Sequence, residues 1–352
     1  MNHFYPATTL ALALSQAGTA LAENPYLEEV IVTSSRIEMP LRQVGTSVSV
    51  VTREKIQQRG FNSLHDILRS QPSIGVTNAG GAGKATSLRI RGEESYRTLV
   101  LLDDIDISDT STPQVTPRME YLLSSGIQRV EILRGPQGLM YGADAGGVVN
   151  ITTVRQTDGL AGQVSAEGGR YGSQQFAGNL GWGNETIDVN VSAADFQTDG
   201  FNARTTDQDL RDDDGYDNTT LHGRFGWNVS EDLRLSLVAR NVDGDTDYDG
   251  CFNPDTFASS NRCKDEFEQD IWRVAGDYQW GRFSHQGFYS NSETNRDSYS
   301  DGQFSGRFDG EIERYGYQGS FQGSDALRLV YGVDLETESA DGTFLTGDRD
   351  QD

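Results

Sequence analysis

The sequence lacks any long hydrophobic run and is poor in basic residues. No stretch approaches the 18 or so apolar residues of a membrane-spanning helix, and the mean hydropathy is -0.56. The 29 basic residues are outnumbered by 53 acidic ones, which gives a formal net charge of -24. Nucleic acid is therefore excluded as a partner, because phosphate binding needs a basic face. Membrane-spanning strands are not excluded, since they alternate outward apolar with inward polar residues.

Residues typical of catalytic sites are also scarce. The four histidines, His3, His65, His222 and His285, are scattered without the spacing of a metal site, and no nucleophile elbow is present. The sequence therefore predicts no enzyme activity.

The two cysteines, Cys251 and Cys263, lie close together in a loop-like stretch, CFNPDTFASSNRC. In an oxidising compartment they would close a small ring that stabilises the fold by about 3 kcal/mol. The alternative is a pair of unrelated thiols. A disulfide is the prediction if the chain is exported.

Residues 1–22 have the pattern of a cleavable signal peptide. A short apolar stretch ends in the small-residue triplet Ala20-Leu21-Ala22. The segment before the apolar stretch contains no lysine or arginine, only His3. The alternative is therefore a frayed cytosolic terminus, but export agrees with the cysteine pair.

Residues 41–155 show the mixed pattern of a compact α+β unit. TSVSVV (46–51) alternates like a strand, and Thr52 and Asn62 can each cap a short helix, the first of which ends at Gly60. Further strand-like runs are SLRIRG, RTLVLLDD, IQRVEILRG and VVNITT. A domain boundary is expected near residue 155.

Residues 156–352 lack helical signals and contain nine candidate strands. They are 161–170, 173–182, 186–197, 218–228, 233–243, 269–281, 283–292, 307–322 and 326–337. In 186–197, Ile187, Val189 and Val191 alternate with Asp188 and Asn190. Such alternation predicts an antiparallel sheet with one apolar face, as in a transmembrane β-barrel.

The connections and the aromatic residues favour a barrel over a soluble β-sandwich. Short turns alternate with long acidic connections at 198–217, 244–268 and 293–306. Trp182, Phe196, Trp227 and Trp280 lie towards strand ends, where aromatic rings meet a membrane interface. The alternatives are a soluble sandwich and a calcium-dependent surface adhesin.

Several motifs resemble one family. EEVIVT (28–33), LRIRG (88–92), LVLLDD (99–104) and IQRVEILRGPQGLMYGADAGGVVNITT (127–153) resemble the box and plug motifs of TonB-dependent outer-membrane receptors. The resemblance is continuous over residues 28–155, and its layout is similar to that of cobalamin receptors. It implies a signal peptide (1–22), a TonB box and linker (23–40), a plug domain (41–155) and a partial barrel (156–352) in the outer membrane of a Gram-negative cell.

The resemblance implies that the first extended segment binds a partner protein. Glu29, Val30, Ile31, Val32 and Thr33 match the TonB box, which would add as a strand to a sheet edge of TonB in the periplasm. The alternative is that these residues form a first strand of the plug itself.

Two arginines of the plug motifs precede glycine, Arg91 in IRG and Arg134 in LRG. A buried arginine needs a partner, and the resemblance implies that both face glutamates on the barrel wall as a plug–barrel lock. The alternative is solvent-facing positive charge at strand ends.

Two plug loops are candidates for ligand contact. The glycine-rich NAGGAGKATS (78–87) offers Asn78, Lys84, Thr86 and Ser87 as donors and acceptors, and IDISDTSTPQVTP (105–117) is the second loop. The first loop is not a phosphate-binding loop, because Ala85 follows Lys84. The alternative is a pair of ordinary mobile loops.

The acidic connections are a further candidate site. By resemblance to cobalamin receptors, Asp199, Asp212, Asp214, Tyr248 and Asp249 would hold calcium, which takes six to eight oxygen ligands. The alternative is solvated surface charge.

The resemblance predicts energised uptake of a scarce, bulky nutrient, with cobalamin favoured over a ferric siderophore. Plugged barrels of this kind close with about 22 strands, whereas the sequence offers nine. We therefore expect an incomplete barrel and a truncated receptor. The alternatives are a calcium-binding surface adhesin and a truncated receptor without function.

Overall fold

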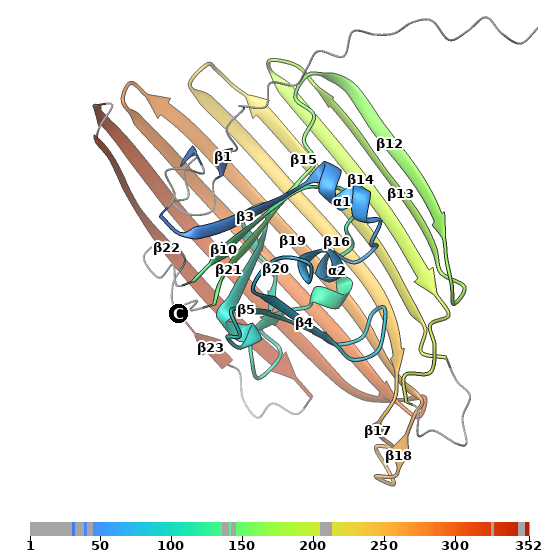
Figure 1. Cartoon of the computed structure of the whole chain (residues 1–352). Coiled ribbons are helices and arrows are strands. Elements are labelled where there is room, and N and C mark those ends of the chain that lie inside the picture. The colour runs from blue at the N-terminus through green and yellow to red at the C-terminus, as the bar shows by residue number, and fades with distance from the viewer. Residues whose placement is uncertain are drawn as a thin grey trace, which may run out of the picture.

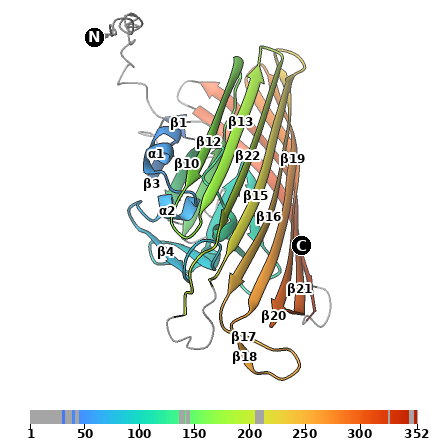
Figure 2. The same ribbon diagram turned by 90° about the vertical axis from the view of Figure 1, so that its right-hand side faces the viewer.

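The computed structural model describes residues 30–31, 39–40, 45–135, 141, 146–204, 213–324, 327–343 and 349–351. Within these ranges the chain forms two parts, a small mixed domain and a large curved sheet (Figure 1). The small domain lies against one face of the sheet (Figure 2). The sheet carries a short disulfide-bonded hairpin at one end, β17 (Cys251–Phe252) and β18 (Ser259–Ser260).

A five-stranded sheet forms the centre of the small domain, the predicted plug. Its order is β3 (Ser47–Thr52), β10 (Ile127–Arg134), β11 (Gly147–Thr153), β6 (Thr98–Leu102) and β7 (Ile105–Asp106). Only the β11–β6 pair is parallel. All four of the longer strands were predicted, β3 from its alternation and the other three as strand-like runs.

The helices of the plug are short. They are α1 (Arg53–Arg59) and α2 (Leu64–Leu68), with single 3-10 turns at Ser95–Arg97 (η2) and Met119–Tyr121 (η3). Gly60 ends α1 in the left-handed conformation, as predicted, whereas Ser63 and not Asn62 precedes α2. No helix in the described ranges is long and apolar enough to cross a lipid bilayer.

The remaining described strands of the plug and of the segment before it form two-stranded pairs. They are β4 (Ile74–Asn78) with β5 (Thr86–Ile90), β8 (Ser108–Asp109) with β9 (Thr116–Pro117), and β1 (Val30–Ile31) with β2 (Met39–Pro40).

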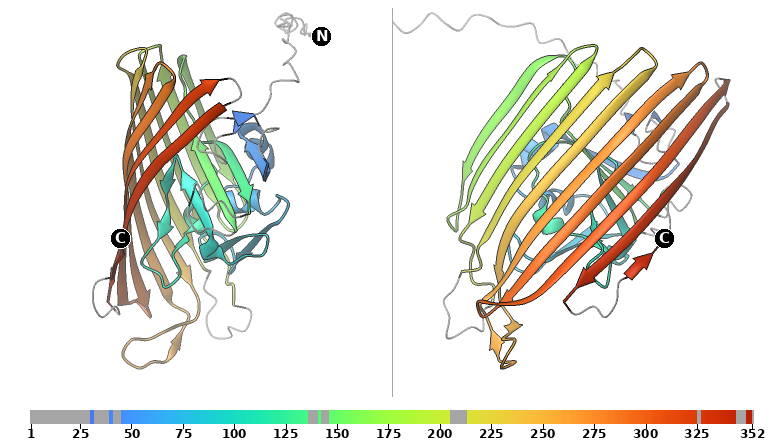
Figure 3. Two further views of the ribbon diagram at one scale, coloured as in Figure 1. Left: turned by 90° about the vertical axis from the view of Figure 1, so that its left-hand side faces the viewer. Right: turned by 180° about the vertical axis from the view of Figure 1, so that it is seen from behind.

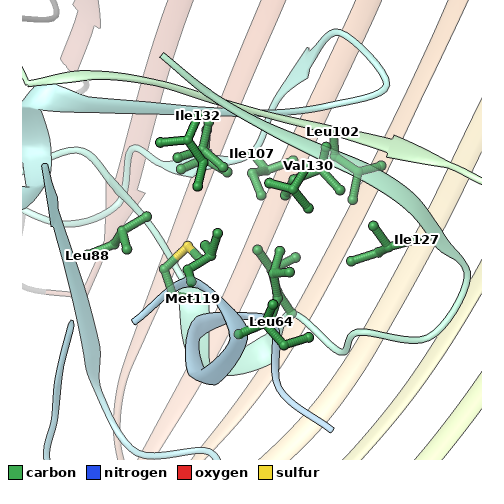
Figure 4. Close-up of a cluster of buried hydrophobic side chains, with 14 of the residues drawn as sticks. Leu64, Leu88, Leu102, Ile107, Met119, Ile127, Val130 and Ile132 are labelled. Carbon is green, nitrogen blue, oxygen red and sulfur yellow. The ribbon is translucent and has the colours of Figure 1, made fainter. Parts of the chain in front are cut away.

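One hydrophobic core joins the plug to the large sheet. Leu64 and Met119 pack with Ile132 from the central sheet of the plug (Figure 4). The same cluster includes Val238 and Ile271, which come from the large sheet. The two parts therefore share buried apolar surface as well as polar contacts.

The large sheet is antiparallel throughout, with its strands in sequence order (Figure 3). The strands are β12 (Gly159–Gly168), β13 (Gln174–Gly183), β14 (Ile187–Thr198), β15 (Tyr216–Asn228), β16 (Leu233–Tyr248), β19 (Cys263–Trp280), β20 (Phe283–Ser300), β21 (Gln303–Ser324), β22 (Leu327–Gly342) and β23 (Arg349–Gln351). All nine predicted strands are present, together with the three-residue β23. Among the described residues β12 and β23 each pair on one side only, so the sheet is curved but not closed.

The strands continue well into the predicted acidic connections. The prediction of a long connection at 293–306 is wrong, because β20 and β21 are joined by the turn at Asp301–Gly302. In the connection predicted at 244–268, residues 244–248 belong to β16 and residues 263–268 to β19, with the disulfide-bonded hairpin between them. Here both faces of the sheet carry polar residues, so the apolar alternation used to predict strands is missing although the backbone is extended.

The outward face of the sheet divides into an apolar and an acidic half. Leu237 of β16 lies opposite Phe225 and Val274 on the neighbouring strands, and these rings and alkyl groups are exposed. Further along the same face Asp270, Glu293 and Glu311 occupy one row on three consecutive strands. The apolar half matches the lipid-facing band of a barrel, and the acidic half extends beyond it.

The predicted interface aromatics separate into two groups. Trp182, Trp227 and Trp280 lie on the outward face near the same end of the sheet, and Trp280 is 65% exposed. The prediction for Phe196 is wrong, because this ring is 6% exposed and packs with Tyr216 against the plug. The even-numbered residues of β14 point to the plug. Because side chains alternate along a strand, Phe196 also points to the plug.

The division of the outward face predicts that a substitution by arginine has a large effect on stability at one position of β16 and a small effect at another. Leu237→Arg places a charge in the apolar half and should reduce the free energy of unfolding by about 2–4 kcal/mol in a bilayer. Asn241→Arg lies in the acidic half, beside Asp270, to which Asn241 now donates a hydrogen bond. It should change stability by less than about 0.5 kcal/mol. Urea unfolding in lipid vesicles measures both, and equal losses would contradict this placement of the membrane.

Candidate functional site: the plug–barrel interface

The predicted ligand loop 78–87 is organised by one asparagine. The Asn78 side-chain amide donates to the carbonyls of Gly81 and Lys84 and to Thr86 Oγ1, at 2.8, 3.2 and 2.9 Å. Its Oδ1 accepts from the backbone N–H groups of Gly80 and Gly81 at 3.0 and 2.7 Å. These bonds fix the loop between β4 and β5 as one unit.

Glycines let this loop approach the barrel wall closely. Gly83 adopts a φ of +70°, and a Cβ at this position would lie 2.0 Å from the Tyr216 ring. A Cβ on Gly80, which has a φ of +144°, would lie 2.6 Å from Ala203 Cβ. Both positions need glycine for backbone conformation and for space. The loop, which resembles a ligand-contacting apex, is therefore packed against the β14–β15 connection.

Lys84 crosses from this loop into the barrel wall. Its ammonium donates to the carbonyls of Asp214 and Gly215 and to Thr246 Oγ1, at 3.2, 3.1 and 3.0 Å. The residue is 5% exposed. Burial lowers the pKa of Lys84 to about 8, although Asp214 and Asp247 oppose this shift. In this conformation the amino group donates its three hydrogen bonds to the barrel.

The four residues predicted to contact ligand thus have different surroundings. Asn78 and Thr86 hold the loop together, Lys84 contacts the barrel, and Ser87 is half-buried in β5. Their role towards a ligand stays a prediction.

A buried charge network connects the two predicted ligand loops. Arg118 Nε donates to Asp109 Oδ2 at 2.8 Å, and its Nη1 lies 3.6 Å from Glu120. Glu120 in turn accepts from the backbone N–H of Thr86 at 3.2 Å. Despite its burial, the pKa of Arg118 is raised because Asp109 and Glu120 stabilise its charge. The loop 105–117 also reaches the barrel, where Thr110 Oγ1 donates to the Ser339 carbonyl at 2.8 Å.

Aromatic contacts lie beside this network. Tyr121 of the plug stacks on Phe267 of β19 with ring centroids 4.0 Å apart and an interplanar angle of 4°. The Tyr216 hydroxyl donates to the Glu120 carbonyl at 3.0 Å, and the Asn218 amide donates to the Tyr121 carbonyl at 3.3 Å. The plug and the wall therefore meet through rings as well as charges.

A second polar junction, nearer the apolar end of the sheet, centres on Asp103. Its carboxylate accepts from Arg224 Nη1 at 2.5 Å and from Thr153 N and Oγ1 at 3.0 and 2.6 Å. His222 Nε2 lies 3.2 Å from Asp103 Oδ2. Arg224 and His222 belong to β15, whereas Asp103 and Thr153 belong to the plug. This ion pair joins the plug directly to the barrel wall.

The backbone around Asp103 explains how its side chain reaches the wall. Asp103 and Asp104 have φ values of +50° and +67° in the two-residue turn between β6 and β7. A two-residue hairpin with two positive φ angles normally uses asparagine, aspartate or glycine. Sequence reasoning missed this junction, although the double aspartate in LVLLDD signals such a turn.

The predicted lock arginines have other neighbours in the described part of the chain. Arg134 donates from Nε to the Pro72 carbonyl at 2.9 Å and from Nη1 to Ser49 Oγ at 2.8 Å, both within the plug. Arg91 is exposed at a φ of +55°. Burial and the nearby charge of Arg91 lower the pKa of Arg134. Their pairing with barrel glutamates stays a prediction.

The TonB-box prediction falls mostly outside the described residues. Glu29, Val32 and Thr33 lie outside, whereas Val30–Ile31 form β1 and pair antiparallel with Met39–Pro40. β1 is not part of the five-stranded plug sheet. The signal peptide, residues 1–22, also lies outside the described residues.

The predicted calcium ligands are not brought together by the residues that the structure describes. Tyr248 donates its hydroxyl to Asp265 at 3.4 Å, and Asp214 Oδ2 accepts from Ala203 N at 2.8 Å. Asp212 lies outside the described residues, and within them no three acidic, histidine or cysteine side chains form a metal-binding group. Calcium binding by Asp199, Asp212, Asp214, Tyr248 and Asp249 stays a prediction.

The disulfide is confirmed. Cys251 and Cys263 are bonded, with their Cα atoms 5.9 Å apart. The bond closes the hairpin formed by β17 and β18, beyond the ends of β16 and β19 (Figure 1).

A small mixed domain packed on the inner face of a curved antiparallel wall, whose outer face is partly apolar, is typical of plugged outer-membrane barrel receptors. Residues 40–149 match the family model of the TonB-dependent Receptor Plug Domain. The chain therefore contains the plug domain of TonB-dependent receptors, and the antiparallel strands that follow it form part of a barrel wall.

Comparison with individual proteins supports this assignment. The chain is 28% identical over 348 residues to the vitamin B12 transporter BtuB of Photobacterium profundum, covering 96% of this chain and 55% of that protein. The siderophore receptor PirA of Acinetobacter baumannii has a TM-score of 0.67 at 18% identity, with 83% of this chain and 48% of that chain covered. A ferric enterobactin receptor (PfeA) mutant of Pseudomonas aeruginosa also gives 0.67, at 20% identity and with 89% and 51% covered. The chain thus spans about half the length of these relatives.

Substitutions in the β6–β7 turn should distinguish the contribution of the ion pair to stability from the contribution of the turn conformation. Asp103→Asn keeps a residue that tolerates positive φ but removes the charge opposite Arg224, and should destabilise the fold by about 2 kcal/mol. Asp104→Asn is the matched control, because Asp104 is exposed in the same turn. Urea unfolding of both variants in detergent tests this expectation. A similar loss in both would show that the turn, not the ion pair, matters.

The same junction predicts a pH dependence. Burial raises the pKa of Asp103, but His222 and Arg224 outweigh it and lower the pKa to about 2. The stabilisation from the ionised form is therefore fully present above the unfolded pKa of about 3.9 and is lost as the pH falls through about 2. Stability measured from pH 6 to pH 2 should fall by about 2 kcal/mol more in the wild type than in Asp103→Asn. Parallel curves would contradict the assignment.

Proposed function

We propose that the chain forms the plug and adjoining barrel wall of a TonB-dependent transporter for energised uptake of a scarce, bulky nutrient. The supporting observation is the placement of the two predicted contact regions. β1 lies near one end of the sheet, and the β17–β18 hairpin and acidic connections lie at the other (Figure 2). A transporter driven from the periplasm needs its energy-coupling segment and its ligand loops on opposite sides of the membrane.

Cobalamin is the ligand that we favour over a ferric siderophore. The relative that covers 96% of this chain is named a vitamin B12 transporter. The two solved siderophore receptors compared above are 18% and 20% identical to this chain, so their similarity supports the fold alone. A surface adhesin is less well supported, because the plug match at 40–149 has no part in such a function.

The coupling role of residues 28–33 is tested by a proline in the box. Ile31→Pro removes a backbone N–H and fixes φ, so it should weaken binding of the periplasmic domain of TonB at least about tenfold. Ser35→Pro, just beyond the box, is the control and should bind normally. Fluorescence anisotropy with the labelled TonB domain gives both affinities. Unchanged binding of Ile31→Pro would remove the box from the proposal.

The choice of ligand is tested separately by equilibrium binding to the chain in detergent. We expect cyanocobalamin to bind and a ferric catecholate siderophore not to bind. The reverse result would replace cobalamin by a siderophore without affecting the coupling role of the box.

A further inference from the structure

The Lys84 ammonium occupies a position that resembles a bound cation. Its three donors meet three oxygens of the barrel: the carbonyls of Asp214 and Gly215 and the hydroxyl of Thr246. These acceptors come from two barrel segments, the end of the β14–β15 connection and β16. One plug side chain therefore joins two separate parts of the wall.

The charges around this position are negative. The carboxylates of Asp214, Asp247 and Asp249 all stabilise the charged form of Lys84. Acidic groups crowded in this way repel one another unless a cation lies between them. The described acidic residues do not form a metal-binding group here, and Lys84 from the plug and Lys264 from β19 supply positive charge near Asp247.

We propose that Lys84 is a tethered counter-cation, through which the plug apex loop holds the acidic connections of the barrel in place of a diffusible divalent ion. The tether is short, because the Lys84 carbonyl accepts from Asn78 Nδ2 and Thr86 Oγ1 at 3.2 and 2.7 Å. Movement of loop 78–87 therefore withdraws the ammonium from the wall. The conformational stability of the acidic connections therefore depends on the position of the plug, whichever nutrient is carried.

The structure also offers a route for a replacement ion. A pocket of about 400 Å³ borders Asp214 and Asp247. It is also lined by Asp213 and Glu266, together with the basic residues Arg262 and Lys264. A hydrated divalent cation can reach the carboxylates from this pocket once the ammonium is gone.

The test replaces the ammonium by an apolar side chain of similar length. In Lys84→Met, amide hydrogen exchange at 213–215 and 246–249 should rise about tenfold, because the charged hydrogen bonds are lost. Millimolar Ca²⁺ should reverse much of this rise and increase the thermal midpoint of the variant more than that of the wild type. Lys55→Met, on the exposed face of α1, is the matched control and should behave as the wild type.

Two further variants keep the test decisive if Lys84→Met does not fold. Lys84→Gln retains a polar tip and should show the same gained response to Ca²⁺. Thr246→Val removes one acceptor but keeps the ammonium, so it should raise exchange by a smaller factor and gain no response to Ca²⁺. The proposal is overturned if exchange in the Lys84 variants matches the wild type, or if the wild type gains as much stability from Ca²⁺ as they do.

Discussion

The rest of the structure depends on how the barrel wall compensates buried charge on the plug. A charge removed from water is tolerated only with a partner close by. Asp103 meets Arg224 near the apolar half of the wall, and Lys84 meets carbonyl and hydroxyl oxygens in the acidic half. These two contacts, with the Tyr121–Phe267 stack between them, fix where the plug lies along the strands.

This arrangement explains why the plug loops and the wall strands have such different compositions. The plug needs glycine where Gly83 meets the Tyr216 ring, and buried polar side chains such as Asn78 where the loop must keep its shape. The wall presents small polar groups and a few arginines inwards and apolar residues outwards. Beyond the apolar band the outward face becomes acidic, so both faces are hydrated there and the strands lengthen without any hydrophobic alternation.

Much of the fold could be predicted from the sequence, because alternation of apolar residues distinguishes the two faces of a strand. The nine wall strands and the longer plug strands follow from such local patterns, and the disulfide follows from two nearby cysteines in an exported chain. The strand segments beyond the apolar band and the inward position of Phe196 were missed. In these polar segments no apolar alternation shows which side chains point inwards. The partners of Asp103 and Lys84 lie 121 and 130 or more positions away, and no local pattern specifies which inward residues meet across that separation.

Energetic coupling between the plug and its wall is the central requirement of this arrangement. The decisive measurement is a double-mutant cycle of Asp103→Asn and Arg224→Gln, with unfolding followed in detergent at neutral pH. We expect a coupling energy of at least about 1 kcal/mol, as for a buried charged hydrogen bond. Additive effects of the two substitutions would contradict this expectation, because the ion pair would then not hold the plug to the barrel.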